Sequence, residues 1–268
     1  MHSSSHDNMS FLEHLEELRW HIIRSLIAII SAGFICFLMK DFIFDTIIFG
    51  PKKMDFPTYK FLCQAATFIG VETTFCGDEF PFIVQNRTMA GQFSAHIMTS
   101  IISGFIISFP YILYEFWKFI SPGLLEKEKA KSRGFIFISS LLFFIGVLFG
   151  YYIISPLSIN FLGTYQVSSQ VLNEIDLGSF ISLVRSSAIA SGIIFELPII
   201  IYFLTKAGVV TPESLVKYRK YALVLVLVLA AIITPPDVAS QIIVAIPIVV
   251  LYQVSIFISK IVVKNQGK

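Results

Sequence analysis

Carboxylate side chains stand next to apolar segments at several places in this sequence. Glu17 and Arg19 lie in the run HLEELR, and Glu126 and Glu128 lie in the run FISPGLLEKEKAKSR. A further carboxylate, Glu196, lies within the apolar run GIIFELPII. Carboxylates form bidentate, charge-assisted hydrogen bonds with guanidinium groups. The acidic runs are therefore either a binding surface for a cationic partner or solvated charges paired within their own helices.

Patterns typical of enzymes and metal sites are missing from the sequence. The five histidines show neither HExxH nor another paired-ligand spacing, and the three cysteines form no CxxC pair. We find no phosphate-binding loop, no GxSxG run and no glycine-rich dinucleotide turn. We therefore expect no enzyme activity, no cofactor and no metal. A net charge of +2 is too small to suggest a nucleic-acid partner.

The composition predicts an all-α integral membrane protein. Of the 268 residues, 55% are hydrophobic and only 14% are charged, which leaves too little polar surface for a soluble domain. About 20 apolar residues are needed for a helix to cross a bilayer. Six segments are predicted to do so: residues 20–44, 93–119, 135–154, 177–205, 221–233 and 242–258.

The last two predicted spans form a short hairpin. They flank the turn TPPDVASQ, and the first of them has only 13 residues, which is about 20 Å of helix. Either the bilayer thins there or the turn lies below the surface. Pro110 and Pro198 fall within spans and are predicted to kink them.

Lysine and arginine set the orientation of the spans. The 206–220 connection and the C-terminal tail are rich in these residues, whereas 157–176 and 234–239 have none. Cytoplasmic loops carry the excess of positive charge, so both termini are predicted to be cytoplasmic and the 45–91 loop periplasmic. The 120–133 loop is cytoplasmic as well, with its cations at Lys127, Lys129, Lys131 and Arg133.

Residues 1–268 are predicted to form a single membrane domain that begins with an amphipathic helix. Leu12, Leu15, Leu18 and Ile22 recur at helical spacing, so residues 1–19 should hold a helix that lies on the cytoplasmic surface. The first nine residues are polar and carry no fold signal.

Several polar residues admit two interpretations. Glu196 is either a structural group hydrogen-bonded between helices or a polar site in a cavity. Glu115 is best explained by an ion pair with Lys118, three residues on. Asp237, with Gln241 beside it, either caps the last helix or binds a partner. Cys63 and Cys76 share the periplasmic loop and either form a disulfide or remain two free thiols.

Four motifs on this topology resemble one family, TatC, the core membrane subunit of the twin-arginine protein translocase. They are HLEELR, FISPGLLEKEK, FELP and TPPDVASQ, and their order and spacing match the family over about residues 10–260. The resemblance implies a concave, glove-like bundle of six helices in the bacterial cytoplasmic (inner) membrane.

The resemblance also implies a function and residue roles. The family exports folded proteins, driven by the proton-motive force, after recognising signal peptides with consecutive arginines. Glu17 and Glu128 match its recognition carboxylates, with Arg19 and Phe119 beside them. Glu196 matches its intramembrane carboxylate, whereas matches at the periplasmic side are Pro51, Asp237 and Gln241.

Implied partners are the signal peptides of folded precursors, single-span subunits of the TatA and TatB type docking on the last two spans, membrane lipid, and further copies of the chain. Two departures from the family pattern stand out: His21 replaces a basic residue, and Glu126 occupies a commonly basic position. The alternative functions are a small-solute transporter that uses Glu196 as its ion site, and a structural membrane scaffold.

Overall fold

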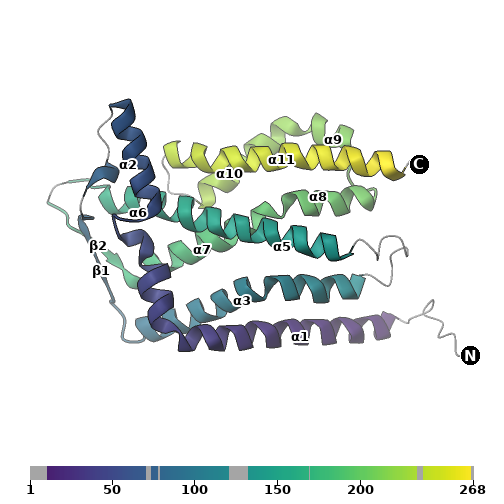
Figure 1. Ribbon diagram of the computed structural model, residues 1–268, viewed down its shortest axis with the longest axis horizontal. Helices are drawn as coiled ribbons and strands as arrows, with labels where there is room; N and C mark the ends of the chain where they lie inside the picture. The colour runs from purple at the N-terminus through teal and green to yellow at the C-terminus, as the bar shows by residue number, and fades with distance from the viewer. Residues whose placement is uncertain are drawn as a thin grey trace, which may run out of the picture. The chain divides into compact units, whose positions relative to one another are not determined.

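The structure is a computed structural model that is mainly helical (Figure 1). It describes residues 11–70, 74–77, 79–120, 132–168, 170–233 and 238–266. Its α-helices are α1 (Phe11–Leu38), α2 (Pro57–Ile69), α3 (Gly91–Ile120), α5 (Ser132–Phe149), α6 (Ser155–Thr164), α7 (Leu177–Phe195), α8 (Leu197–Lys206), α9 (Pro212–Lys217), α10 (Arg219–Ile233) and α11 (Val238–Gln266). Shorter helical turns are η2 (Phe42–Ile48), η3 (Gly50–Lys52), η4 (Thr74–Cys76) and η6 (Gly150–Ile154).

Five helical stretches in the described residues are long and apolar enough to cross a membrane, namely Leu15–Leu38, Gly91–Ile120, Gly134–Thr164, Leu177–Lys206 and Gln241–Lys264. They correspond to five of the six predicted spans. The remaining segment, α10, has 15 residues, which is about 22 Å of helix and less than the hydrocarbon thickness of about 30 Å. The count of six spans therefore stays a prediction.

The helix boundaries differ from the predicted ones at both ends of the chain. The predicted surface helix and first span are one continuous helix, α1, which ends at Leu38 rather than at residue 44. At the other end, α11 has 29 residues rather than 17, because a helix can continue past its apolar stretch once Lys260 and Lys264 reach a polar environment. Only the α10 half of the last hairpin is short.

The predicted 45–91 loop contains secondary structure that hydropathy did not indicate. Helix α2 begins with Pro57 at its first turn and ends at Gly70, whose φ of 77° is the left-handed conformation that glycine adopts at low cost. Further on, β1 (Phe82–Gln85) pairs in parallel with β2 (Asn173–Asp176). Parallel strands need a long crossover, which here includes two predicted spans, so no local signal reveals the pairing.

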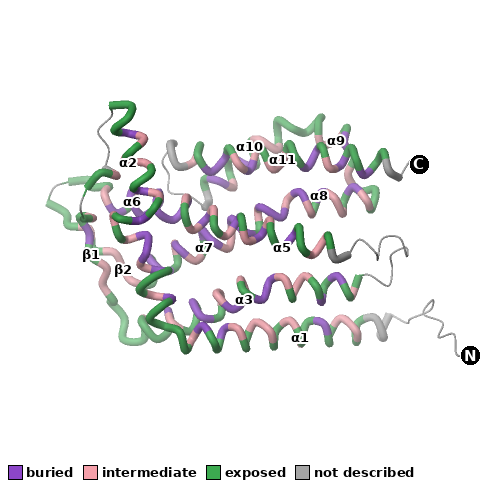
Figure 2. Tube along the Cα trace, in the orientation of Figure 1, coloured by how far each residue is buried: buried purple, intermediate pink, exposed green. Residues whose placement is uncertain are grey.

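The chain divides into two compact units. The first unit comprises residues 1–39 and 97–141, and the second comprises residues 40–96 and 142–268. In the first unit, α1 runs beside α3 (Figure 1). Apolar side chains on α1, such as Ile30 and Phe34, are exposed, as expected of helices that face lipid rather than a soluble core. Figure 2 shows exposed and half-buried positions along α1.

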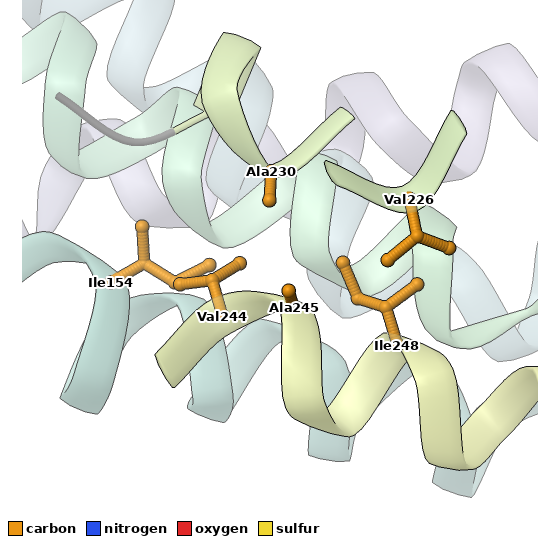
Figure 3. Packing of buried hydrophobic residues seen from close by; sticks show 6 residues of the cluster. All are labelled: Ile154, Val226, Ala230, Val244, Ala245 and Ile248. Carbon is orange, nitrogen blue, oxygen red and sulfur yellow. The ribbon is translucent and has the colours of Figure 1, made fainter. Parts of the chain in front are cut away.

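An apolar core in the second unit holds α10 against α11. Val226 and Ala230 of α10 point toward Val244 and Ile248 of α11, with Ile154 at the end of the cluster (Figure 3). Small residues such as Ala230 allow the close approach on which helix association in membranes depends. A buried hydrogen bond between two hydroxyl groups also joins α8 to α11, at 2.9 Å from Thr205 to Ser259.

Tyr59 organises the lobe built around α2. Its side chain is fully buried, and its hydroxyl lies 2.8 Å from the carbonyl oxygen of Pro51 and 3.0 Å from that of Pro156. One O–H group donates to two buried carbonyls that prolines bring into place. Burial also raises the pKa of this hydroxyl, so it stays protonated as a donor.

The first prediction concerns this hydroxyl. Tyr59→Phe leaves two buried carbonyls without their donor, and we expect it to lower the free energy of unfolding by about 1–3 kcal/mol. Thermal unfolding in detergent, followed by circular dichroism, measures the effect. Tyr165→Phe, at an exposed position, is the control; equal melting temperatures for the two variants would contradict the role of Tyr59.

Candidate functional site

The predicted binding residues of the first unit lie at one end of the α1–α3 pair. Glu17 is half-buried on α1, and Phe119 is half-buried in the last turn of α3. Glu128 follows α3 by eight residues but lies outside the described residues. The structure thus brings one predicted carboxylate and the predicted aromatic residue to the same pair of helices.

A buried hydrogen bond that the sequence did not predict lies beside these residues. Nδ1 of His21 on α1 is 2.6 Å from Oε2 of Glu115 on α3, and the two residues are only 6% and 3% exposed. Nη1 of Arg24 is 3.7 Å from the same carboxylate oxygen. The ring of His21 also meets that of Phe119 edge-on, with centroids 6.0 Å apart. Glu115 thus pairs across helices, with His21 and Arg24 of α1.

Arg19, which the resemblance implies as part of the peptide site, contacts its neighbours on α1. Its guanidinium is 3.7 Å from Glu16, and both side chains are largely exposed. It also lies over the ring of Trp20, 5.6 Å from the centroid. An exposed ion pair of this kind is easily exchanged, so Arg19 can release Glu16 or join another carboxylate at little cost.

Close backbone approach holds α1 and α3 in one register. A Cβ atom on Gly104 would lie 2.5 Å from the backbone nitrogen of Gly33 and from the carbonyl oxygen of Ile29. Oγ of Ser108 donates to the carbonyl oxygen of Ala28 at 2.9 Å. Glycine at position 104 is therefore required by the spacing of the two helices.

Glu196 lies at the junction of α7 and α8 in the second unit. Its carbonyl accepts hydrogen bonds from the backbone N–H groups of Ile199 and Ile200 at 2.9 and 3.0 Å. Pro198, in the first turn of α8, has no N–H to continue α7, so the predicted kink is a break between two helices. The Glu196 side chain is buried, at 9% exposure.

The remaining predicted residues of the second unit have structural contacts. Pro51 is fully buried and holds Tyr59 through its carbonyl. The amide of Gln241 donates to the carbonyl oxygen of Leu227 at 3.1 Å, which joins α11 to α10. Asp237 lies outside the described residues. Partner contacts through any of these positions stay predictions.

Cys63 and Cys76 form a disulfide that links α2 to η4, with their Cα atoms 5.1 Å apart. Cys36, the third cysteine, is a buried free thiol on α1. Of the two interpretations left open by the sequence, the structure has the disulfide.

Comparison with known proteins assigns the chain to a family. The sequence matches the Sec-independent protein translocase protein (TatC) family over residues 13–247. The chain belongs to the TatC family. It is therefore a component of a Sec-independent protein translocase, which is a membrane assembly and not an enzyme.

Two curated TatC relatives cover nearly the whole chain. The protein from Blattabacterium sp. subsp. Periplaneta americana is 46% identical over 261 residues, which is 97% of this chain and 98% of that protein. The protein from Aquifex aeolicus is 37% identical over 261 residues, covering 96% and 98%.

Solved TatC structures match the fold. A crystal structure of the twin-arginine translocase receptor TatC is 35% identical with a TM-score of 0.67, covering 94% of this chain and 100% of that one. Another, in the detergent DDM, is 36% identical with a TM-score of 0.70, covering 92% and 99%. The predicted all-helical membrane class of this TatC-family chain is confirmed.

Sequence reasoning missed the His21–Glu115 bond, although signals existed. His21 follows Glu17 by one helical turn, and Glu115 precedes Phe119 by one turn. A buried carboxylate in a predicted span calls for a partner. The sequence offered Lys118 nearby and Arg24 or His21 far away, and only the packing of α1 on α3 decides between them.

The second prediction tests the close approach of these helices. We expect Gly104→Ala to force α1 and α3 apart and to lower the free energy of unfolding by about 1–3 kcal/mol. Gly134→Ala on α5 is the matched control, because a Cβ there meets nothing within 4 Å. Thermal unfolding in detergent compares the two variants; a Gly104→Ala protein as stable as the Gly134→Ala protein would refute the close approach.

Proposed function

We propose that this chain is the signal-peptide receptor of its translocase. It binds the consecutive arginines of a signal peptide through Glu17 on α1 and Glu128 in the segment after α3, at the cytoplasmic face. The observation that carries the proposal is the position of Glu17, half-buried on α1 one helical turn before His21, whose ring contacts that of Phe119. Phe119 lies in the last turn of α3, the helix that precedes Glu128 in the sequence by eight residues. Solved relatives of the chain are described as twin-arginine translocase receptors.

The chemistry of the two carboxylates suits paired arginines. A guanidinium group presents a planar fork of donors that two carboxylate oxygens accept together, whereas a lysine ammonium does not. Two neighbouring arginines thus require two carboxylates. An ion pair in open water contributes little, but a partly dehydrated site at the membrane boundary strengthens it.

The finer assignments belong to the same proposal. The chain lies in the bacterial inner membrane as one domain of six spans with both termini in the cytoplasm, and the 45–91 segment faces the periplasm, where its disulfide is favoured. The single-span TatA- and TatB-type subunits dock on α10 and α11, near Asp237 and Gln241. Glu196 acts after peptide binding, in a step that involves those subunits. Membrane lipid and further copies of the chain complete the assembly.

The third prediction concerns the two carboxylates. Glu17→Gln and Glu128→Gln each remove one charge-assisted pair without changing side-chain size, and we expect each to weaken peptide binding by about 10- to 100-fold. Binding of a fluorescent twin-arginine peptide to the purified chain in lipid nanodiscs measures the loss.

Glu126→Gln is the matched control, since it removes a charge from the same loop at a position outside the family pattern. We expect that variant to bind as the unchanged chain does. Wild-type affinity in the Glu17→Gln and Glu128→Gln variants would rule out the assigned site.

The fourth prediction separates binding from transport. We expect Glu196→Ala to keep the peptide affinity of the unchanged chain within about twofold and to reduce export of a twin-arginine precursor at least about tenfold. Glu196 is buried at a helix break of the second unit and is not one of the carboxylates proposed to bind the arginines. Export into the periplasm of cells that depend on this chain is the readout. Lost peptide affinity in the variant would show that its role is misplaced.

A further inference from the structure

We propose that the buried His21–Glu115 hydrogen bond is the positioning element of the twin-arginine site: it keeps Glu17 and Phe119 opposite each other and so sets the geometry that paired arginines require. Both residues are positioning residues that do not touch the peptide. This inference rests on the proposed receptor function. It adds His21 and Glu115 to the site, two residues that lie outside the four sequence motifs.

The register of α1 and α3 places Glu17 and Phe119 at the same level. From His21 to Ala28, α1 advances seven residues, and from Glu115 back to Ser108, α3 retreats seven residues, with contacts at both levels. The helices are therefore antiparallel with matched steps of two helical turns. Continuing that register by one turn beyond the hydrogen bond places Glu17 opposite Phe119.

The His21–Glu115 bond lies beyond the close contact of the two helices, toward Glu17. Small residues and close backbone contacts fix the helix pair around Gly33 and Gly104, and the Ser108–Ala28 hydrogen bond follows. From there the His21–Glu115 bond is about 10 Å further along the helices. It lies one helical turn from Glu17 on α1 and one turn from Phe119 on α3, so we infer that it sets the spacing at this end of the pair.

The Glu115 side chain is buried between the two helices. At 3% exposure, the Glu115 side chain is too deeply placed to bind a peptide arginine directly. Its carboxylate already accepts from His21 and has the Arg24 guanidinium at 3.7 Å. A buried polar group without its partner is costly. Removal of Glu115 leaves the imidazole of His21 without its acceptor, and the two helix ends are then free to shift.

His21 also contacts Phe119, the aromatic residue of the proposed site. The ring of His21 meets Phe119 edge-on, so the same imidazole that bonds Glu115 also contacts the aromatic residue of the proposed peptide site. Loss of its hydrogen bond frees the imidazole to rotate, and Phe119 then loses a fixed neighbour. His21 on α1 thus contacts two residues of α3: it bonds Glu115, which fixes the positions of the helices along their axes, and it packs against Phe119, which fixes the orientation of that ring.

The fifth prediction separates positioning from charge. Glu115→Leu removes the acceptor of His21, and we expect it to weaken binding of a twin-arginine peptide about tenfold. Glu115→Gln keeps an acceptor oxygen in the same place and should stay within about threefold of the unchanged chain. An attractive role of the Glu115 charge would instead make Gln as damaging as Leu, and that result would overturn the proposal.

Ser108→Ala is the matched structural control, because it breaks another hydrogen bond between the same two helices, two turns away. We expect unchanged peptide affinity in that variant. Equal losses in Ser108→Ala and Glu115→Leu would show that any loosening of the helix pair weakens binding, and would overturn a specific positioning role.

A measurement without peptide keeps this inference distinguishable from the receptor function. Spin labels at the exposed positions Glu16 and Phe116, in a Cys36→Ser background, report the distance between the ends of α1 and α3 by pulsed electron resonance. We expect a broader or shifted distance distribution for Glu115→Leu and an unchanged one for Glu115→Gln and Ser108→Ala. An unchanged distribution in Glu115→Leu refutes positioning, whereas a shifted one without any twin-arginine binding by the unchanged chain refutes only the receptor function.

Discussion

Hydrocarbon offers no water, so every polar group at membrane depth must find its partner within protein. This constraint explains why the described spans are helical and why several polar side chains there form hydrogen bonds across helices. The His21–Glu115 bond joins α1 to α3, the Thr205 hydroxyl joins α8 to α11 through Ser259, and Gln241 joins α11 to α10. In each case a polar side chain that would be costly in lipid becomes a specific link between helices.

The candidate receptor site has a part that is held rigidly between helices and a part whose charged groups exchange partners. Within the first unit, close backbone approach and one buried hydrogen bond hold the helix that bears Glu17 against the helix that bears Phe119. A preformed wall reduces the cost of ordering when a flexible peptide binds. Charged groups at its rim, such as Arg19 and Glu16, exchange partners easily. Recognition can therefore combine a fixed geometry with readily displaced surface ions.

Hydropathy and short motifs predicted the membrane class, five spans that the structure has, a kink at Pro198 and the family itself. They failed where structure depends on distant contacts. Neither the parallel pairing of β1 with β2 nor the choice of His21 as the partner of Glu115 has a local signature. Helix ends were misplaced because apolar sequence and helix do not stop together: α1 ends before its apolar run, and α11 continues beyond it.

The proposed receptor recognises paired arginines by the geometry of the guanidinium group. The most direct test is the affinity of the purified chain, in lipid nanodiscs, for a signal peptide with two arginines and for the same peptide with two lysines. The two peptides carry equal charge, so general electrostatic attraction is the same for both. We expect at least about tenfold tighter binding of the arginine peptide; equal affinities would contradict recognition by guanidinium geometry.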